Sequence, residues 1–180
     1  MSGRSDAESM EPQASRPSMP PEYGIQAPTA EQGVLPWTWA VERLAVAHGY
    51  WLATTRPDGH PHVAVVWGVW LGNHYYFATS VASRKGRNLA ANPHRVVCPE
   101  DTAEAVIVEG IAEAVTDHAA LERFSQAYAS KYAEEIDTDL FQVYQVRPVV
   151  AFATLSDAER FPTTATRWRF ADVRACDATV

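Results

Sequence analysis

Apolar and polar residues alternate through much of the middle of the chain, with the period of two that is typical of β-strands. Residues 50–55 alternate in this way, and the turn sequence at 57–59 predicts a hairpin into a second strand over residues 62–71. The apolar residues of this second strand fall on both of its faces. A further turn at 72–73 leads into a third strand over residues 74–79. We therefore expect three antiparallel strands in succession.

Four later segments follow the same alternation, namely residues 94–99, 104–115, 141–155 and 166–170. We expect a bulge or bend at Gly110 and a kink or interruption at Pro148. Helical spacing predicts a helix that Thr38 caps, a second that begins near Ser83, and a third over residues 117–133. About six antiparallel strands with few helices are typical of a small closed barrel. The chain is expected to be mainly β with flanking helices.

The first 34 residues differ in composition from the rest of the chain. Residues 10–36 hold half of the 12 prolines, among Ser, Gln, Glu and Ala, and have few apolar side chains to bury. We expect residues 1–34 to form a disordered N-terminal tail and residues 35–175 to form one domain. Removal of the first 30 residues should then leave the mass of the assembly and its ligand affinity unchanged.

Composition narrows the class of protein further. A chain of 180 residues with 47% apolar residues can form one domain with a proper core. Its formal net charge of -7 argues against broad nucleic-acid binding, which requires a basic surface. Cys98 and Cys176 are too few and too distant in sequence for a disulfide framework or a zinc site. No apolar run is long enough to span a bilayer and no signal-peptide core follows Met1, so we expect a cytoplasmic protein that does not enter membranes.

The most informative stretch is the basic start of the helix near residue 83. Ser83, Arg84, Lys85 and Arg87 crowd its first turn. Cations oppose the helix dipole there, because the exposed N–H groups already carry partial positive charge. The arrangement becomes favourable when an anion lies among the N–H groups, the hydroxyl and the charged side chains, and a phosphate is the obvious candidate. A solvated basic turn that merely caps a surface helix is the alternative.

Other combinations of reactive residues are weaker. His60 and His62 could hold a metal on one strand face, but no Cys or carboxylate cluster completes such a site, so we expect no metal. Ser83 beside Lys85 suggests a nucleophile with an amine base, yet no oxyanion pocket is implied, and we assign no catalytic side chain. Trp67 or Trp70, whichever points outward, is expected to be an exposed aromatic that needs cover.

Several motifs, taken in order, resemble those of one known family. They are Gly59-His60-Pro61-His62-Val63 leading into Val66-Trp67-Gly68, the stretch from Phe77 to Lys85, Arg87-Asn88-Leu89 with Asn92-Pro93, and Val108-Glu109-Gly110. Residues 36–171 thereby resemble the split β-barrel proteins related to pyridoxamine 5'-phosphate oxidase. The ending Ala165-Thr166-Arg167-Trp168-Arg169-Phe170 is similar to the branch that uses the deazaflavin cofactor F420. Trp67-Gly68 replaces the basic residue that usually closes the second strand, and the Arg-Leu-x-Pro ending is absent, which argues against pyridoxamine phosphate as the substrate.

The resemblance implies a six-stranded antiparallel split β-barrel that forms a homodimer with two cofactors at its interface. Each cofactor ring is expected against the second and third strands of one subunit, with its phosphate at the Ser83 helix and the C-terminal segment of the partner over it. The implied cofactor contacts are His62, Val65, Val66, Trp67, Thr79, Ser83, Arg84, Lys85, Arg87, Asn88, Arg167 and Trp168.

Two functions follow from the resemblance, and in both the cofactor supplies the chemistry. The first is an F420H2-dependent oxidoreductase that transfers hydride to a small, conjugated, electron-poor substrate. The alternative is an FMN-binding protein, either an oxidoreductase or a non-catalytic carrier. We expect F420 to be preferred, because its oligoglutamate tail requires a local basic lane, to which Arg84, Arg87, Arg160, Arg167, Arg169 and Arg174 are suited. Nearby carboxylates at Asp157, Glu159, Asp172 and Asp177 offer those arginines an alternative set of partners.

Overall fold

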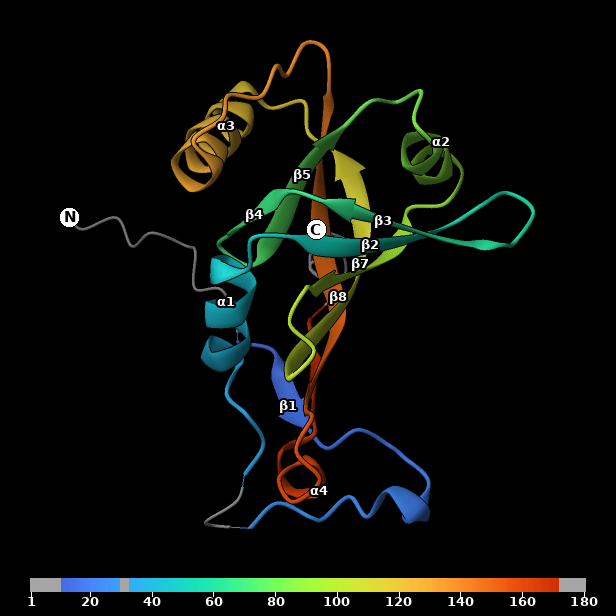
Figure 1. Cartoon of the computed structure of the whole chain (residues 1–180), viewed down its shortest axis with the longest axis vertical. Helices are drawn as coiled ribbons and strands as arrows, with labels where there is room; N and C mark the ends of the chain where they lie inside the picture. The colour runs from blue at the N-terminus through green and yellow to red at the C-terminus, as the bar shows by residue number, and fades with distance from the viewer. Residues whose placement is uncertain (1–10, 30–32, 172–180) are drawn as a thin grey trace, which may run out of the picture.

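The computed structural model describes residues 11–29 and 33–171, and nine strands of this part of the chain form one antiparallel sheet (Figure 1). The strands are β1 (Gln13–Ser15), β2 (Tyr50–Thr55), β3 (Pro61–Val66), β4 (Gly68–Leu71), β5 (His74–Thr79), β6 (His94–Pro99), β7 (Glu104–Ala114), β8 (Gln142–Leu155) and β9 (Thr166–Arg169). The helices are α1 (Trp37–Val46), α2 (Arg84–Ala91), α3 (His118–Tyr132), α4 (Phe161–Thr164) and a short 3-10 helix, η1 (Pro21–Tyr23). The expected class, mainly β with flanking helices, is confirmed.

Strands follow one another around a core until the sheet nearly closes. β3 pairs with β2, β2 with β6, β6 with β7, β7 with β8, β8 with β5, and β5 with β4. β3 and β4 belong to the stretch predicted as one strand, which breaks at Trp67 and changes its pairing partner from β2 to β5. The two ends of the sheet are thus joined by the chain itself. The strands expected from the sequence count this broken strand once, include β9 as residues 166–170, and omit β1.

The two longest strands, β7 and β8, run through the whole molecule (Figure 1). Their register shifts at Gly110, which pairs with Pro148 while Glu109 pairs with Val150, so Val149 has no counterpart. This irregularity confirms the bend expected at Gly110, and Pro148 lies beside it without ending β8. β8 pairs with β5 before the bulge and with β9 after it, so the bulge separates the barrel from the extension that β9 and β1 form.

Large aromatic side chains fill the barrel, and α1 covers one side of it. The largest fully buried side chains of this core include Trp168, Tyr50, Tyr75 and Phe77. From α1, Trp37 meets Trp168 edge to face, with ring centroids 5.3 Å apart. The helix begins at Trp37, after Pro36, and no side chain caps it. The predicted Thr38 cap is therefore wrong, because the extended backbone of Pro36 starts the helix earlier.

A smaller cluster lies between α3 and the sheet. Asp117 caps α3 by accepting a hydrogen bond from Ala120 N at 2.8 Å. Phe124 and Tyr128 point from the helix onto the sheet, where they join Val69 and Val143 in a buried cluster. The helix predicted over residues 117–133 is confirmed, together with the apolar face that buries it.

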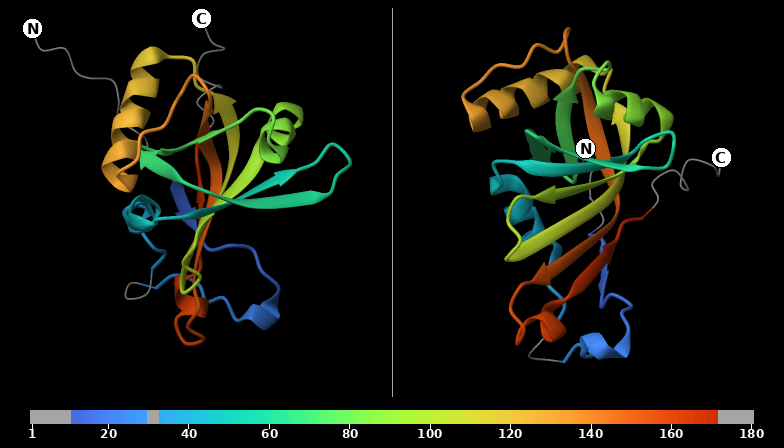
Figure 2. Two further views of the ribbon diagram at one scale, coloured as in Figure 1. Left: turned by 45° about the horizontal axis from the view of Figure 1, so that its top comes forward. Right: turned by 45° about the vertical axis from the view of Figure 1, so that its right-hand side comes forward.

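The N-terminal segment is the main disagreement with the predicted organisation. Within residues 11–29, β1 pairs with β9 at the edge of the sheet (Figure 2). Arg16 donates hydrogen bonds to the carbonyls of Ala165 at 3.0 Å, Thr163 at 2.5 Å and Gln26 at 3.0 Å. The predicted disordered tail is therefore wrong for residues 11–29, because β9 presents unpaired backbone groups that this segment satisfies. Residues 1–10 and 30–32 lie outside the described residues, as do residues 172–175 at the end of the predicted domain.

Candidate functional site

The site begins at the break between β3 and β4. A β-carbon on Gly68 would lie 2.3 Å from Tyr75 Oη and 2.4 Å from the carbonyl oxygen of Tyr76, so only glycine allows β4 to approach β5 this closely. The break separates two tryptophans of different character. Trp67 is 44% exposed and Trp70 only 8% exposed. Trp67 is thus the outward-facing ring that the sequence left undecided.

The start of α2 is the second part of the site, and it lies near Ser83, where the sequence predicts the start of a helix. Ser83 is the N-cap, and its Oγ accepts a hydrogen bond from Gly86 N at 3.0 Å. Thr79 Oγ1 lies 3.1 Å from the same Ser83 oxygen and ties the end of β5 to the helix. The backbone of α2 lies so close to residues 80–81 that a β-carbon on Gly86 would be 2.4 Å from the carbonyl oxygen of Ser80. The orientation of the basic first turn is therefore set by close backbone packing.

Positive charges converge on His62 of β3. Burial lowers the pKa of the His62 imidazole, and the nearby charges of Arg56, Arg84 and Lys85 lower it further, so the ring is neutral at neutral pH. The Nε atom of Arg56 is buried and has no hydrogen-bond partner. Three cations from the β2–β3 hairpin and α2 thus lie near enough to His62 to lower its pKa, and an anion among them would relieve their mutual repulsion.

Sequence reasoning missed Arg56. The residue directly follows β2, and its backbone N–H donates to the carbonyl of His60 at 2.9 Å across the hairpin. The hairpin register that the turn sequence predicts would have placed Arg56 close to His62.

A cavity of about 350 Å³ adjoins the basic cluster. Its walls are Val65, Val66, Trp67, Ala78, Lys85, Tyr128 and Ile136. The fold therefore brings four of the predicted cofactor contacts, Lys85 and the three residues at the end of β3, to one cavity. Tyr128 and Ile136 were not predicted there. The spacing of Tyr128 along α3 indicated only that it packs against the sheet. In the structure it belongs to that buried cluster and also lines the cavity.

Several predicted contacts have other roles in this chain. Trp168 is fully buried against Trp37, so its assignment as a cofactor contact is wrong: its place in β9 points it into the core. Asn88 is also fully buried, and its Nδ2 donates to Thr54 Oγ1 at 3.0 Å, which braces α2 against β2 rather than facing a ligand. Arg87 donates to the carbonyl of Ala82. Arg167 donates from Nε and Nη2 to Ser15 Oγ at 3.3 and 3.2 Å.

The C-terminal arginines do not reach the basic cluster within one chain. α4 and β1 lie at the opposite end of the molecule from α2 (Figure 1). Arg160 lies at the start of α4, Arg167 and Arg169 lie in β9, which pairs with β1, and Arg174 lies outside the described residues. None of the described C-terminal arginines is among the charges that lower the pKa of His62.

Within residues 11–29 and 33–171, no three His, Cys, Asp or Glu side chains gather closely enough to hold a metal ion. No helix there combines the length and apolar character needed to cross a membrane.

Comparison with protein families identifies the fold. The model of the family described as pyridoxamine 5'-phosphate oxidase matches residues 40–165. The chain belongs to the pyridoxamine 5'-phosphate oxidase family. The match spans the barrel, the basic start of α2 and all of α3. The recognition made from the motifs is thereby confirmed at the level of the family.

Solved structures with the same fold differ in what their names say they bind. A protein named F420 reductase is 28% identical, with a TM-score of 0.51 over 61% of this chain and 93% of its own. A conserved hypothetical protein from Mycobacterium tuberculosis is 20% identical, with a TM-score of 0.60 over 71% of this chain and 89% of its own. HutZ, a heme storage protein from Vibrio cholerae, is 19% identical, with a TM-score of 0.52 over 62% of this chain and 88% of its own. The sequence has no match among curated proteins.

Proposed function

We propose that this protein is an F420H2-dependent reductase whose cofactor phosphate binds at the start of α2. The observation that carries the proposal is the convergence of Arg56, Arg84 and Lys85 on neutral His62 beside the cavity that Trp67 walls. The residues fit a phosphate, since the buried Nε of Arg56 lacks a protein partner and Ser83 caps the helix.

The residues of the chain divide the work of binding. Lys85, Arg84 and Arg56 hold the phosphate by charge-assisted hydrogen bonds. The end of β3, with Val65, Val66 and Trp67, supplies an apolar wall for a planar ring system and excludes water from it. When bound, F420H2 supplies a hydride to an electron-poor conjugated substrate. No side chain is assigned the role of acid or base.

F420 is favoured over FMN by two observations. The F420 reductase is the relative with 28% identity, and it shares 93% of its length with this chain. Arg160 at the start of α4 and Arg167 and Arg169 of β9 can hold the anionic tail of a cofactor bound to a partner subunit. An FMN oxidoreductase or FMN carrier is the alternative, because FMN presents a phosphate to the same helix.

The proposal includes a homodimer. Trp51, Val63 and Val65 on the outer face of β2 and β3 are 48%, 54% and 55% exposed. The pairing of Trp51 with Val65 places these side chains on one continuous face. A face this apolar is unusual on a monomer, and a second copy would cover it. Light scattering should return about twice the 19.9 kDa of one chain, and a monomer mass with cofactor present would contradict the dimer.

The proposal also includes a small-molecule substrate and a location in the cytoplasm. The formal net charge of -7 disfavours a nucleic-acid partner, since phosphate backbones bind basic surfaces.

Titration with the two cofactors tests the proposed function. Lys85→Ala should weaken F420 binding by about one to two orders of magnitude, because a charge-assisted pair is lost. Arg56→Ala should also weaken it, although Arg56 lies outside the family motifs. Arg123→Ala, which removes an exposed charge on α3, is the matched control and should leave the affinity unchanged.

Salt and tail length separate F420 from FMN. If the arginines hold the tail, F420 affinity falls as ionic strength rises and grows with each added glutamate, because exposed charge pairs are screened within about 10 Å at 0.1 M salt. If FMN outcompetes F420 at equal concentration, the FMN-binding alternative is correct. If both variants bind both cofactors as the parent does, the phosphate site itself is refuted.

A further inference from the structure

The break between β3 and β4 leaves backbone groups that the sheet does not satisfy. β3 pairs with β2 as far as Val66, opposite Tyr50, and β4 pairs with β5 from Gly68, opposite Phe77. The N–H and the carbonyl of Gly68 point away from β5, toward α3. Unpaired and away from water, such groups would cost free energy comparable to a lost hydrogen bond each.

Two adjacent residues at the end of α3 satisfy both groups. Gly68 N donates to Tyr132 Oη at 3.0 Å, and Lys131 Nζ donates to the carbonyl oxygen of Gly68 at 3.1 Å. Tyr132 Oη also lies 2.8 Å from that carbonyl oxygen and 2.9 Å from the carbonyl oxygen of His48. The hydroxyl has a single proton, and Lys131 already serves Gly68, so Tyr132 is free to donate to His48. The break is thus tied to α3 and to the turn that follows α1.

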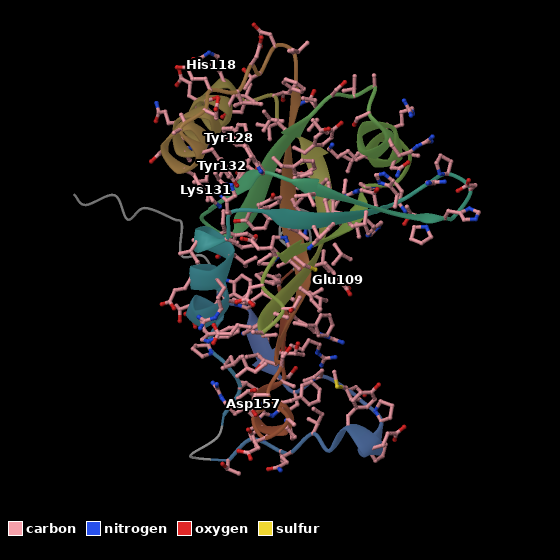
Figure 3. All side chains as sticks on the ribbon, viewed as in Figure 1. Glu109, His118, Tyr128, Lys131, Tyr132 and Asp157 are labelled. Carbon is pink, nitrogen blue, oxygen red and sulfur yellow. The ribbon has the colours of Figure 1, made fainter. Side chains whose placement is uncertain are left out.

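The same tyrosine supports the exposed ring at the break. Tyr132 stacks on Trp67, with centroids 5.0 Å apart and planes 5° apart, and its ring centroid lies 4.8 Å from that of Tyr128. Trp67 and Tyr128 both line the cavity of about 350 Å³, whereas Tyr132 does not. Figure 3 shows Tyr128, Lys131 and Tyr132 on the side of α3 that faces the sheet. Tyr132 therefore contacts two walls of the cavity from behind.

Lys131 is held as firmly as its neighbour. Its Nζ donates to Tyr50 Oη at 2.8 Å and lies 4.8 Å above the Tyr50 ring. Burial lowers the pKa of Lys131 to about 8, against the opposing effect of Glu100. An amine that gives up part of its hydration for two hydrogen bonds and two aromatic rings is fixed in position.

We propose that Lys131 and Tyr132 are positioning residues for the cofactor cavity: they hold the Trp67–Gly68 break in place and thereby set the ring of Trp67. The inference rests on the proposed function, since it assigns Trp67 to the wall that the cofactor ring meets. Neither residue touches the cavity, so their influence on binding passes through the backbone of Gly68 and the stacked indole.

The test uses the full-length protein and conservative substitutions. Tyr132→Phe keeps the ring that stacks on Trp67 and removes the hydroxyl, and Lys131→Gln removes the amine. Tyr76→Phe is the matched control, because it also removes one tyrosine hydroxyl bond on this side of the sheet, the one donated to Gln145 Oε1 at 2.8 Å. Dissociation constants for F420, melting temperatures, and the exchange rate of the Gly68 amide without ligand are measured for each.

The positioning role predicts a specific pattern of results. Tyr132→Phe weakens F420 binding about tenfold and speeds exchange of the Gly68 amide, and Lys131→Gln weakens binding about threefold. Tyr76→Phe lowers the melting temperature to a similar extent but changes affinity less than twofold. A merely structural role would move the melting temperatures alone.

The opposite results are equally clear. If the parent protein binds F420 and Tyr132→Phe binds it no worse than Tyr76→Phe does, the inference is overturned while the proposed function stands. An unchanged Gly68 exchange rate in Tyr132→Phe also overturns it. If the parent protein binds neither F420 nor FMN, the proposed function fails and the inference fails with it.

Discussion

The close approach of α2 to the loop before it provides the sharpest test of how the proposed phosphate site is built. Gly86 follows Lys85 directly, and its N–H is the group that Ser83 caps. A β-carbon there would lie 2.4 Å from the carbonyl oxygen of Ser80, and 2.7 and 2.8 Å from the carbonyl oxygen and Cα of Val81. Gly86→Ala therefore moves the start of α2 without altering any charged side chain.

Two opposing effects set the size of the change. Alanine is a better helix former than glycine by about 1 kcal/mol. Overpacking costs about 1 to 3 kcal/mol, and the upper end applies here because the three clashing atoms are backbone and cannot rotate away. The net loss in free energy of unfolding is about 2 kcal/mol, or about 4 to 8 °C in melting temperature for a chain of this size. Displacement of the cap and of Lys85 should weaken F420 binding about tenfold, because charge-assisted hydrogen bonds depend on geometry.

Thermal unfolding and cofactor titration of Gly86→Ala measure both effects. Gly49→Ala is the control, because its β-carbon would meet only Glu100 Oε2 at 3.6 Å and Val65 Cγ1 at 3.8 Å, which are ordinary contacts. The control should leave the melting temperature and the affinity near those of the parent. A Gly86→Ala protein that is as stable as the parent and binds F420 as tightly would refute the argument that backbone packing orients the site.

Three other predictions concern parts of the fold outside the cavity. Trp168→Ala should lower the free energy of unfolding by about 3 to 5 kcal/mol in urea titrations, because it empties a fully buried site. Arg16→Ala should lower the melting temperature by several degrees, since it removes bonds that hold the N-terminal segment, and no change would restore the view of that segment as an unpacked tail. Between about pH 8 and its usual pKa near 10.5, Lys131 binds fewer protons when folded than when unfolded, so its contribution to stability rises with pH. The stability of the parent relative to Lys131→Met should therefore rise between about pH 8 and pH 10.5, and a difference that does not vary with pH would contradict the lowered pKa.

Local rules explain what the sequence determined by itself. The hairpin turn before β3, the helix that begins near Ser83 and the bend at Gly110 each depend on a few consecutive residues, and all three are present as predicted. The repeat of apolar side chains predicted the strands and the buried face of α3. A period of two places apolar residues on one face of a strand, and a period near 3.6 places them on one face of a helix. The family motifs lie on these same segments, which is why the family was recognisable from the sequence.

Pairing between distant segments was decided only by the tertiary structure. Strand alternation does not reveal that β3 and β4 separate at Trp67, since the break depends on which neighbour, β2 or β5, each half can reach. The N-terminal segment has the composition of a disordered tail, yet the free edge of β9 orders it. The proposed anion site depends on Arg56, a hairpin residue that becomes part of it only when α2 folds nearby. In each case the deciding free energy comes from a contact between residues far apart in sequence, which no local pattern records.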